Sequence, residues 1–205
     1  MADFSKFGVP FENGKLGMLQ AKSNYRFRVM FQNIGFNTDS RILTQNVIAA
    51  ERPKVEFAEG QMNSYNSRAY FAGRHTWNPV TIRFYDDLSN GVVSMIGQQI
   101  QKQMNHIEQT SATAGGNYKF TTEIHTLDGT ANDEIEKWVM YGCWIQTYTT
   151  PDSEYTNDDG ANEVSITLRY DTAQHLVGPN DLGGNVLDGD PMENRSSGTD
   201  NISII

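Results

Sequence analysis

The sequence predicts a mainly β protein: an antiparallel β-sandwich or barrel with one flanking α-helix and a projecting hairpin or loop. Several short segments repeat apolar residues at every second position, which is the period of a strand with one buried face. One segment, 92–107, instead places apolar residues three or four positions apart, as an amphipathic helix does. Strands and helices do not follow each other in regular pairs, so a parallel sheet built from strand–helix–strand units is not expected.

The length of 205 residues fits a single domain. We expect an N-terminal arm over 1–24, a β domain over 25–173 and a C-terminal tail over 174–205. The arm shows no sustained helical or strand period. The tail is rich in Gly, Asp, Asn and Pro and has few apolar residues before Ile202. We therefore expect it to lack a core of its own.

The first strand is predicted at 25–31, where Tyr25, Phe27, Val29 and Phe31 recur at every second position. A turn over 33–40 should follow it, because this stretch contains Gly35 and several polar residues.

A second extended region covers 43–57 and contains Pro53. Proline cannot donate a hydrogen bond to a neighbouring strand, so this region is expected at an edge, at a strand start or in an excursion from the sheet. The next segment, 61–71, mixes polar residues with four large apolar or aromatic ones, Met62, Tyr65, Tyr70 and Phe71. This mixture is typical of a projecting hairpin or loop that contacts a partner.

The most regular strand is predicted at 80–85, because Val80, Ile82 and Phe84 alternate with residues of the opposite face. Phe84 is expected to be buried. The strand should end at Asp86 and Asp87.

The helix over 92–107 is expected to begin at Ser89 or Asn90, whose side chain can accept a hydrogen bond from a free backbone N–H. Its buried face is predicted to consist of Val92, Ile96, Ile100, Met104 and Ile107. The remaining face is polar and should meet water or a neighbour; its residues are Gln98, Gln99, Gln101, Lys102 and Gln103.

Three further strands are predicted downstream. They cover 118–124, the aromatic-rich segment 136–146, which should be covered on both faces, and 164–170. The connection from the helix to the first of them is expected at 110–117, and the connections between them at Asp128-Gly129 and in the acidic loop 149–162.

Charge and composition exclude several functions. The chain has 25 acidic and 16 basic residues and a formal net charge of -9, so its surface should repel phosphates and tight nucleic-acid binding is not expected. No segment approaches the roughly 18 consecutive apolar residues of a membrane span, and residues 1–10 do not resemble a secretion signal. The single cysteine, Cys143, allows no intrachain disulfide and is expected to be a packing residue.

No catalytic, cofactor or metal site is expected. The four histidines fall in four different predicted segments, and no cysteine and histidine spacing fits a zinc site. The acidic run 155–160 lacks two of the acids that a calcium loop needs, since Tyr155 and Ile166 stand at those positions. Asp86 and Asp87 are interpreted as a strand end before a helix N-terminus instead of an acid–base pair. An enzyme is therefore not expected.

Two motifs carry a resemblance to a known family. One is Gly73-Arg-His-Thr-Trp-Asn-Pro-Val-Thr-Ile-Arg-Phe-Tyr-Asp-Asp87, and the other is Trp138-Val-Met-Tyr-Gly-Cys-Trp144. Upstream, the segments 52–57 and 62–63 match the approach to a projecting hairpin. In this order, over residues 25–170, the sequence resembles the tail tube proteins of contractile-tailed bacteriophages.

This resemblance implies a β-sandwich with a flanking helix, assembled as stacked homohexameric rings that surround a channel for DNA. It also implies sheath, baseplate, tail-terminator and tape-measure proteins as partners, a location in the virion tail and assembly in the host cytoplasm. DNA would pass without specific binding, and the negative charge of the chain would oppose its adhesion to the wall.

Two alternatives remain open at the level of the sequence. The tube subunit of a type VI secretion system or of a phage-tail-like bacteriocin would have the same architecture. A β-sandwich module that binds carbohydrate or a receptor would instead use Trp77 or Tyr70 in an exposed groove.

If the chain forms a tube, the subunits should join head to tail through edge strands and the excursion over 51–71. The N-terminal arm should then dock on an adjacent subunit, because its apolar side chains gain free energy on burial. The candidate interface residues are Arg52, Pro53, Met62, Tyr65, Tyr70, Phe71, Phe4 and Phe7.

Overall fold

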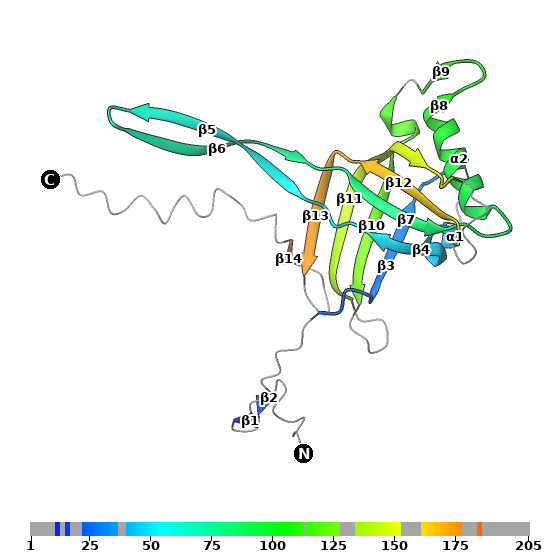
Figure 1. Ribbon diagram of the computed structural model, residues 1–205, viewed down its shortest axis with the longest axis horizontal. Coiled ribbons are helices and arrows are strands. Elements are labelled where there is room, and N and C mark those ends of the chain that lie inside the picture. Colours follow the sequence, from blue (N-terminus) through cyan, green and yellow to red (C-terminus); the bar gives the residue numbers. More distant parts are fainter. Residues whose placement is uncertain are drawn as a thin grey trace.

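The computed structural model describes residues 22–36, 40–112, 114–127, 134–152 and 161–177, and the short strands β1 (Phe11–Glu12), β2 (Lys15–Leu16) and β14 (Gly184–Asn185). The fold class is as predicted: antiparallel strands form a sandwich, a helix flanks it, and a long hairpin projects from it (Figure 1). No helix in the described part of the chain is long and apolar enough to cross a membrane.

Two sheets share one long strand. The first sheet contains β3 (Phe27–Gln32), β10 (Phe120–Leu127), the first half of β11 (Glu134–Thr149), β13 (Thr172–Val177) and β14. The second contains β4 (Val47–Ala50), β7 (Val80–Tyr85), β12 (Glu163–Arg169) and the second half of β11. Strand β11 pairs with β13 over 136–141 and with β12 over 144–149, so it connects the two sheets.

Gly142 lies where β11 passes from one sheet to the other. Its φ is +69°, and a Cβ atom at this position would overlap the carboxylate of Asp171. The backbone N–H of Asp171 donates to the carbonyl of Tyr141 at 3.0 Å, which holds the two segments close together. Glycine is therefore required here for both its backbone conformation and its lack of a side chain.

The core lies between the two sheets. Val80, Ile82 and Phe84 of β7 are fully buried, which confirms the predicted alternation of this strand. The rings of Phe31 in β3 and Phe84 approach to 6.0 Å between centroids, so the two sheets are in direct contact. Cys143 is also fully buried, and burial raises the pKa of its thiol to about 11, as expected for a packing residue.

Helix α2 (Gly91–Gln103) differs from the prediction at both ends. Neither Ser89 nor Asn90 caps it with a side chain; the Asp87 carboxylate accepts the backbone N–H of Gly91 at 2.9 Å, and the Ser89 hydroxyl donates to the same carboxylate at 2.5 Å. The capping prediction was wrong because Asn90 adopts a left-handed conformation, with φ of 53°.

The helix also ends earlier than predicted, so Met104 and Ile107 do not belong to its buried face. Met104 is extended and begins a small hairpin, β8 (Met104–Asn105) and β9 (Thr110–Ser111). The side-chain oxygen of Asn105 accepts the backbone N–H groups of Ile107 and Glu108, and thereby stabilises a turn in place of another helical turn.

The polar face of α2 is only partly directed to solvent. Gln99 is fully buried; its side chain accepts the backbone N–H of Gly35 at 2.8 Å and donates to the carbonyl of Tyr118 at 2.6 Å. Gln103 is half-buried and forms two hydrogen bonds with the backbone of Ile145, where the β11–β12 pairing shifts register. These two glutamines satisfy backbone groups of two irregular segments and of β11 at its register shift.

Several boundaries also differ. Helix α1 (Arg41–Asn46) occupies part of the region predicted as extended, and its Leu43 is fully buried. Tyr25 lies outside β3 and is mostly exposed. The connection over 110–117 includes a short 3-10 helix, η2 (Gly115–Asn117). Strand β13 extends the sheet past residue 173, where we expected the tail to begin.

Candidate subunit interface

The hairpin of β5 (Val55–Ser64) and β6 (Ser67–Trp77) projects from the sandwich and pairs with neither sheet (Figure 1). Its strands pair from Val55 opposite Trp77 to Ser64 opposite Ser67. The sequence predicted this projection over 61–71, and the structure shows that it is longer. Side chains alternate between the two faces along both strands, but almost every residue is exposed because both faces point away from the core.

A β-bulge divides the hairpin into two halves. Between the pairs Phe57–His75 and Glu59–Ala72, β6 contains one residue more than β5. A Cβ atom on Gly73 would lie against the carbonyl oxygen of Ala58, which is the close approach that such a bulge produces. Because the side-chain direction alternates along a strand, the extra residue reverses which face of the hairpin the apolar side chains of β6 occupy.

The inner half carries its apolar side chains on one face. Phe57, His75 and Trp77 form a series of ring contacts with centroids 6.2 and 6.3 Å apart, and the Trp77 ring lies 5.8 Å from that of Tyr170. This inner patch thus continues outward from the core. Phe57, at the outer end of this patch, is 61% exposed.

The outer half carries its apolar side chains on the opposite face. Met62 pairs with Ala69 and Gly60 pairs with Phe71, so all four residues share one side. A Cβ atom on Gly60 would overlap the ring of Phe71, which shows that this ring lies across the neighbouring strand. Met62 and Phe71 are 63% and 58% exposed. The hairpin therefore presents an inner and an outer apolar patch on opposite sides.

The structure separates the predicted interface residues. Met62 and Phe71 form the outer patch, Tyr65 lies at the turn, and Tyr70 is on the face opposite Phe71. Pro53 is buried within the subunit, and Arg52 precedes the hairpin. Phe4 and Phe7 lie outside the described residues. The sequence did not identify Phe57 and His75 as interface residues, because apolar and aromatic residues at alternate positions also occur in a half-buried strand.

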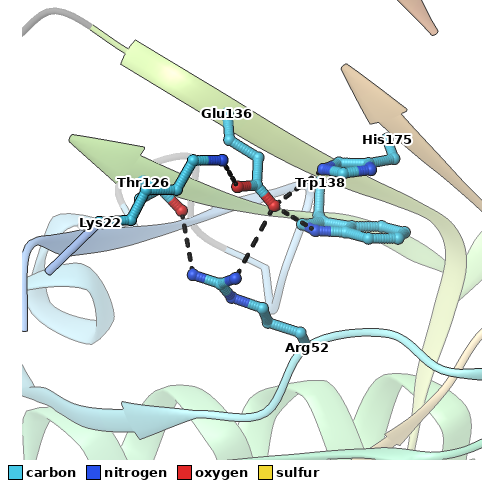
Figure 2. Close-up of polar contacts among 6 residues, drawn as sticks. All are labelled: Lys22, Arg52, Thr126, Glu136, Trp138 and His175. Carbon is cyan, nitrogen blue, oxygen red and sulfur yellow. Dashed lines mark hydrogen bonds and ion pairs between the residues drawn. The ribbon is translucent and has the colours of Figure 1, made fainter. Parts of the chain in front are cut away.

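Glu136 is the centre of a polar cluster near the beginning of the hairpin (Figure 2). Its carboxylate lies 2.7 Å from the Lys22 ammonium, 3.8 Å from the Arg52 guanidinium and 2.8 Å from Nε2 of His175. The indole N–H of Trp138 also donates to it at 3.1 Å. The cluster joins the segments before β3 and β5 to the central strand β11.

The cluster keeps Glu136 ionised although the residue is only 4% exposed. Burial would raise the pKa of its carboxyl group, but hydrogen bonds from Lys22 and His175 and the charges of Lys22 and Arg52 outweigh this effect and lower the pKa to about 2. A carboxylate with so low a pKa is a poor general base near neutral pH.

Glu123 forms a second cluster on the same sheet. Its carboxylate contacts Gln32 at 2.7 Å, Lys137 at 2.9 Å and His125 at 3.1 Å. The hydrogen bond from His125 and the contact with Lys137 lower its pKa to about 2 despite burial. Both clusters act as structural ion pairs. Within the described ranges, no group of three or more metal-binding side chains is arranged to hold an ion.

Comparison with known proteins identifies the fold. No protein-family model matches the sequence, and no curated protein matches it. Solved structures do. A chain of the anti-feeding prophage cap, a tube terminating cap, aligns with a TM-score of 0.60 and 12% identity, covering 80% of this chain and 96% of that one.

Two structures of an extracellular contractile injection system, PVC, are also similar. A chain of its sheath–tube complex in the extended state gives a TM-score of 0.58 at 12% identity, covering 78% of this chain and 94% of that one. A chain of its sheath/tube terminator gives 0.53 at 14% identity, covering 76% and 96%. The contractile tail tube resemblance seen in the sequence is therefore confirmed at the level of the fold.

Proposed function

We propose that this chain is a structural subunit that polymerises into the tube of a contractile tail or tail-like particle, and that it is not an enzyme. The fold supports this proposal, because it extends over nearly the full length of chains from sheath–tube and cap complexes. The observation that carries it is the projecting hairpin, which leaves the outer patch and Phe57 of the inner patch exposed in the described part of the subunit.

A hairpin with apolar patches on opposite sides favours contacts with two different neighbours. Burial of one large apolar side chain stabilises a protein by about 1.5–3 kcal/mol, so covering either patch against a neighbour would be favourable. We propose that each hairpin docks on a different surface of its neighbour, so that the contact is heterologous and growth does not stop at a dimer. We propose stacked homohexameric rings as the product.

The sequence motifs favour a bacteriophage tail as the specific setting. There the tube would be a conduit for DNA, with sheath, baseplate, terminator and tape-measure proteins as partners, and the subunit would be part of the virion tail. The net charge of -9 supports passage of DNA without binding. The same subunit in a secretion or bacteriocin tube would differ in its cargo.

The test compares charge substitutions on the two faces of the outer hairpin. Phe71→Asp removes the centre of the outer patch, whereas Gln61→Asp places the same charge on the opposite face, where the side chain is also exposed. We expect wild-type protein and Gln61→Asp to form rings or tubes of uniform bore in negative-stain micrographs. Phe71→Asp should raise the concentration needed for assembly by at least about tenfold, as loss of about 1.5–3 kcal/mol requires.

Circular dichroism of dilute subunits checks that both variants are folded. Equal assembly of the two variants would refute the interface, and absence of rings or tubes from concentrated wild-type protein would refute the function. Tyr70→Asp changes the face opposite Phe71 and tests separately whether that face takes part in assembly.

A further inference from the structure

A pocket of about 630 Å³ lies at the open side of the sandwich, between β3 and β4. Its lining combines apolar residues, among them Phe27, Ile48 and Ile124, with polar ones such as Asn24 and Thr126. Among the described strands, β3 pairs only with β10, and β4 pairs only with β7. Both edges beside the pocket therefore carry unpaired backbone groups that could receive an extended segment.

The rim of the pocket is basic although the chain as a whole is acidic. Arg52 lines it, and Lys22 lies just before the lining residue Asn24. Both side chains are about half exposed and share one carboxylate, that of Glu136, as Figure 2 shows. Two positive charges facing one negative charge leave a surplus that attracts an acidic segment. The Glu51 carboxylate accepts the backbone N–H of Thr81 in β7, and Glu51 is not among the residues that line the pocket.

The chain contains an acidic segment with suitable apolar residues. Residues 186–205 include four acids and one base, and Ile202 and Ile204 stand at alternate positions near its end. In an extended conformation these two side chains point to the same face. The N-terminal segment 1–21 also has apolar residues, but it contains two acids and two bases. Charge therefore favours the C-terminal segment as the occupant.

The pocket also lies close to where this segment leaves the sheet. Phe27, Thr126, Glu136 and Val177 form one row across the first sheet, and the first two line the pocket. Val177 is two strands from Thr126, or about 10 Å at the usual strand spacing. Strand β14 pairs with Val177. An extended chain advances about 3.3 Å per residue, so the stretch between Asn185 and Ile202 is long enough to reach the pocket.

We propose that residues 186–205 fold back on their own subunit, with Ile202 and Ile204 in the pocket between β3 and β4 and the acidic side chains near Lys22 and Arg52. The segment covers the apolar lining residues of the pocket and lies beside two sheet edges that would otherwise be open to other chains. This inference does not depend on tube formation, because it concerns a single subunit.

Disulfide trapping in the full-length chain tests the contact. Ile48→Cys with Ile204→Cys joins the pocket to the segment, and Asn63→Cys with Ile204→Cys is the control on the exposed hairpin. A disulfide requires Cβ atoms about 3.5–4.5 Å apart. Under mild oxidation of dilute protein, we expect the first pair to form an intrachain disulfide at least about tenfold faster than the control. Native Cys143 should not compete, because it is fully buried.

Peptide mass spectrometry identifies the linked residues, and non-reducing electrophoresis separates intrachain from interchain products. Adding Ile202→Asp to the pocket pair should slow trapping to the control rate. The proposal is overturned if the pocket and control pairs react equally fast, if Ile202→Asp has no effect, or if the disulfide forms only between chains. Each result is obtained with dispersed subunits and is therefore distinct from a failure of tube assembly.

Discussion

Replacing Glu136 by glutamine should lower the stability of the subunit in a pH-dependent manner. The substitution keeps the size of the side chain but removes the charge that Lys22, Arg52 and His175 surround. It thereby leaves two positive charges close together at the start of the hairpin. The hydrogen bond from Trp138 can remain, since an amide oxygen also accepts.

The magnitude follows from the lowered pKa. Folding shifts the pKa of the Glu136 carboxyl from its ordinary value of 4.5 to about 2. Each pKa unit corresponds to about 1.4 kcal/mol, which sets an upper limit of about 3 kcal/mol. Lys22 and Arg52 are about half exposed, and solvent weakens their attraction, so we expect a loss of about 1–2 kcal/mol at pH 7.

The sign of the pH dependence is fixed by the direction of the shift. A carboxylate with a lowered pKa stabilises the folded state fully above its ordinary pKa and loses this contribution as the pH falls through its folded value. The difference between wild type and Glu136→Gln should therefore be largest above about pH 5 and shrink towards pH 2. Urea unfolding of dilute subunits, followed by circular dichroism at several pH values, measures it.

Glu163→Gln is the matched control, because Glu163 pairs with Arg83 at 3.2 Å but both side chains are about half exposed. Its loss should stay below about 1 kcal/mol. The reasoning is refuted if Glu136→Gln costs no more than this control, or if its cost does not fall on acidification.

Two core substitutions should lower stability by different mechanisms. Phe84→Ala removes a fully buried ring and should cost about 3–5 kcal/mol in the free energy of unfolding; an unchanged melting temperature in circular dichroism would contradict its burial. Gln99→Leu leaves the N–H of Gly35 and the carbonyl of Tyr118 without their partner. We expect a loss of about 2–4 kcal/mol, and a shift of the urea midpoint no larger than that of an exposed substitution would contradict it.

The regular elements were predictable because their signal is local. Val80, Ile82 and Phe84 alternate in sequence, and all three are buried in β7. The helix was predicted from its repeating apolar residues, and α2 forms there. The hairpin was predicted as a projection from Pro53 and the mixed segment 61–71. In each case a strand or helix period, or a residue that cannot continue a sheet, is present in consecutive residues.

Other features depend on partners that are distant in the sequence. Asp87 caps α2 because Asn90 has a left-handed backbone, and Gln99 is buried because two loops bring unpaired backbone groups to it. A polar residue on a helix gives no local sign of such a partner. The sequence therefore predicted that Gln99 would face water or a neighbour.

The candidate interface shows the same division. The sequence by itself determined that Met62, Tyr70 and Phe71 belong to an excursion from the β domain. Only the tertiary structure decided that Phe71 lies on the face opposite His75 and Trp77, because one extra residue in β6 reverses the alternation between them. Strand pairing also assembled the Glu136 cluster from segments far apart in the chain. Side-chain period is a property of one strand, whereas register and ion pairing are properties of the strands together.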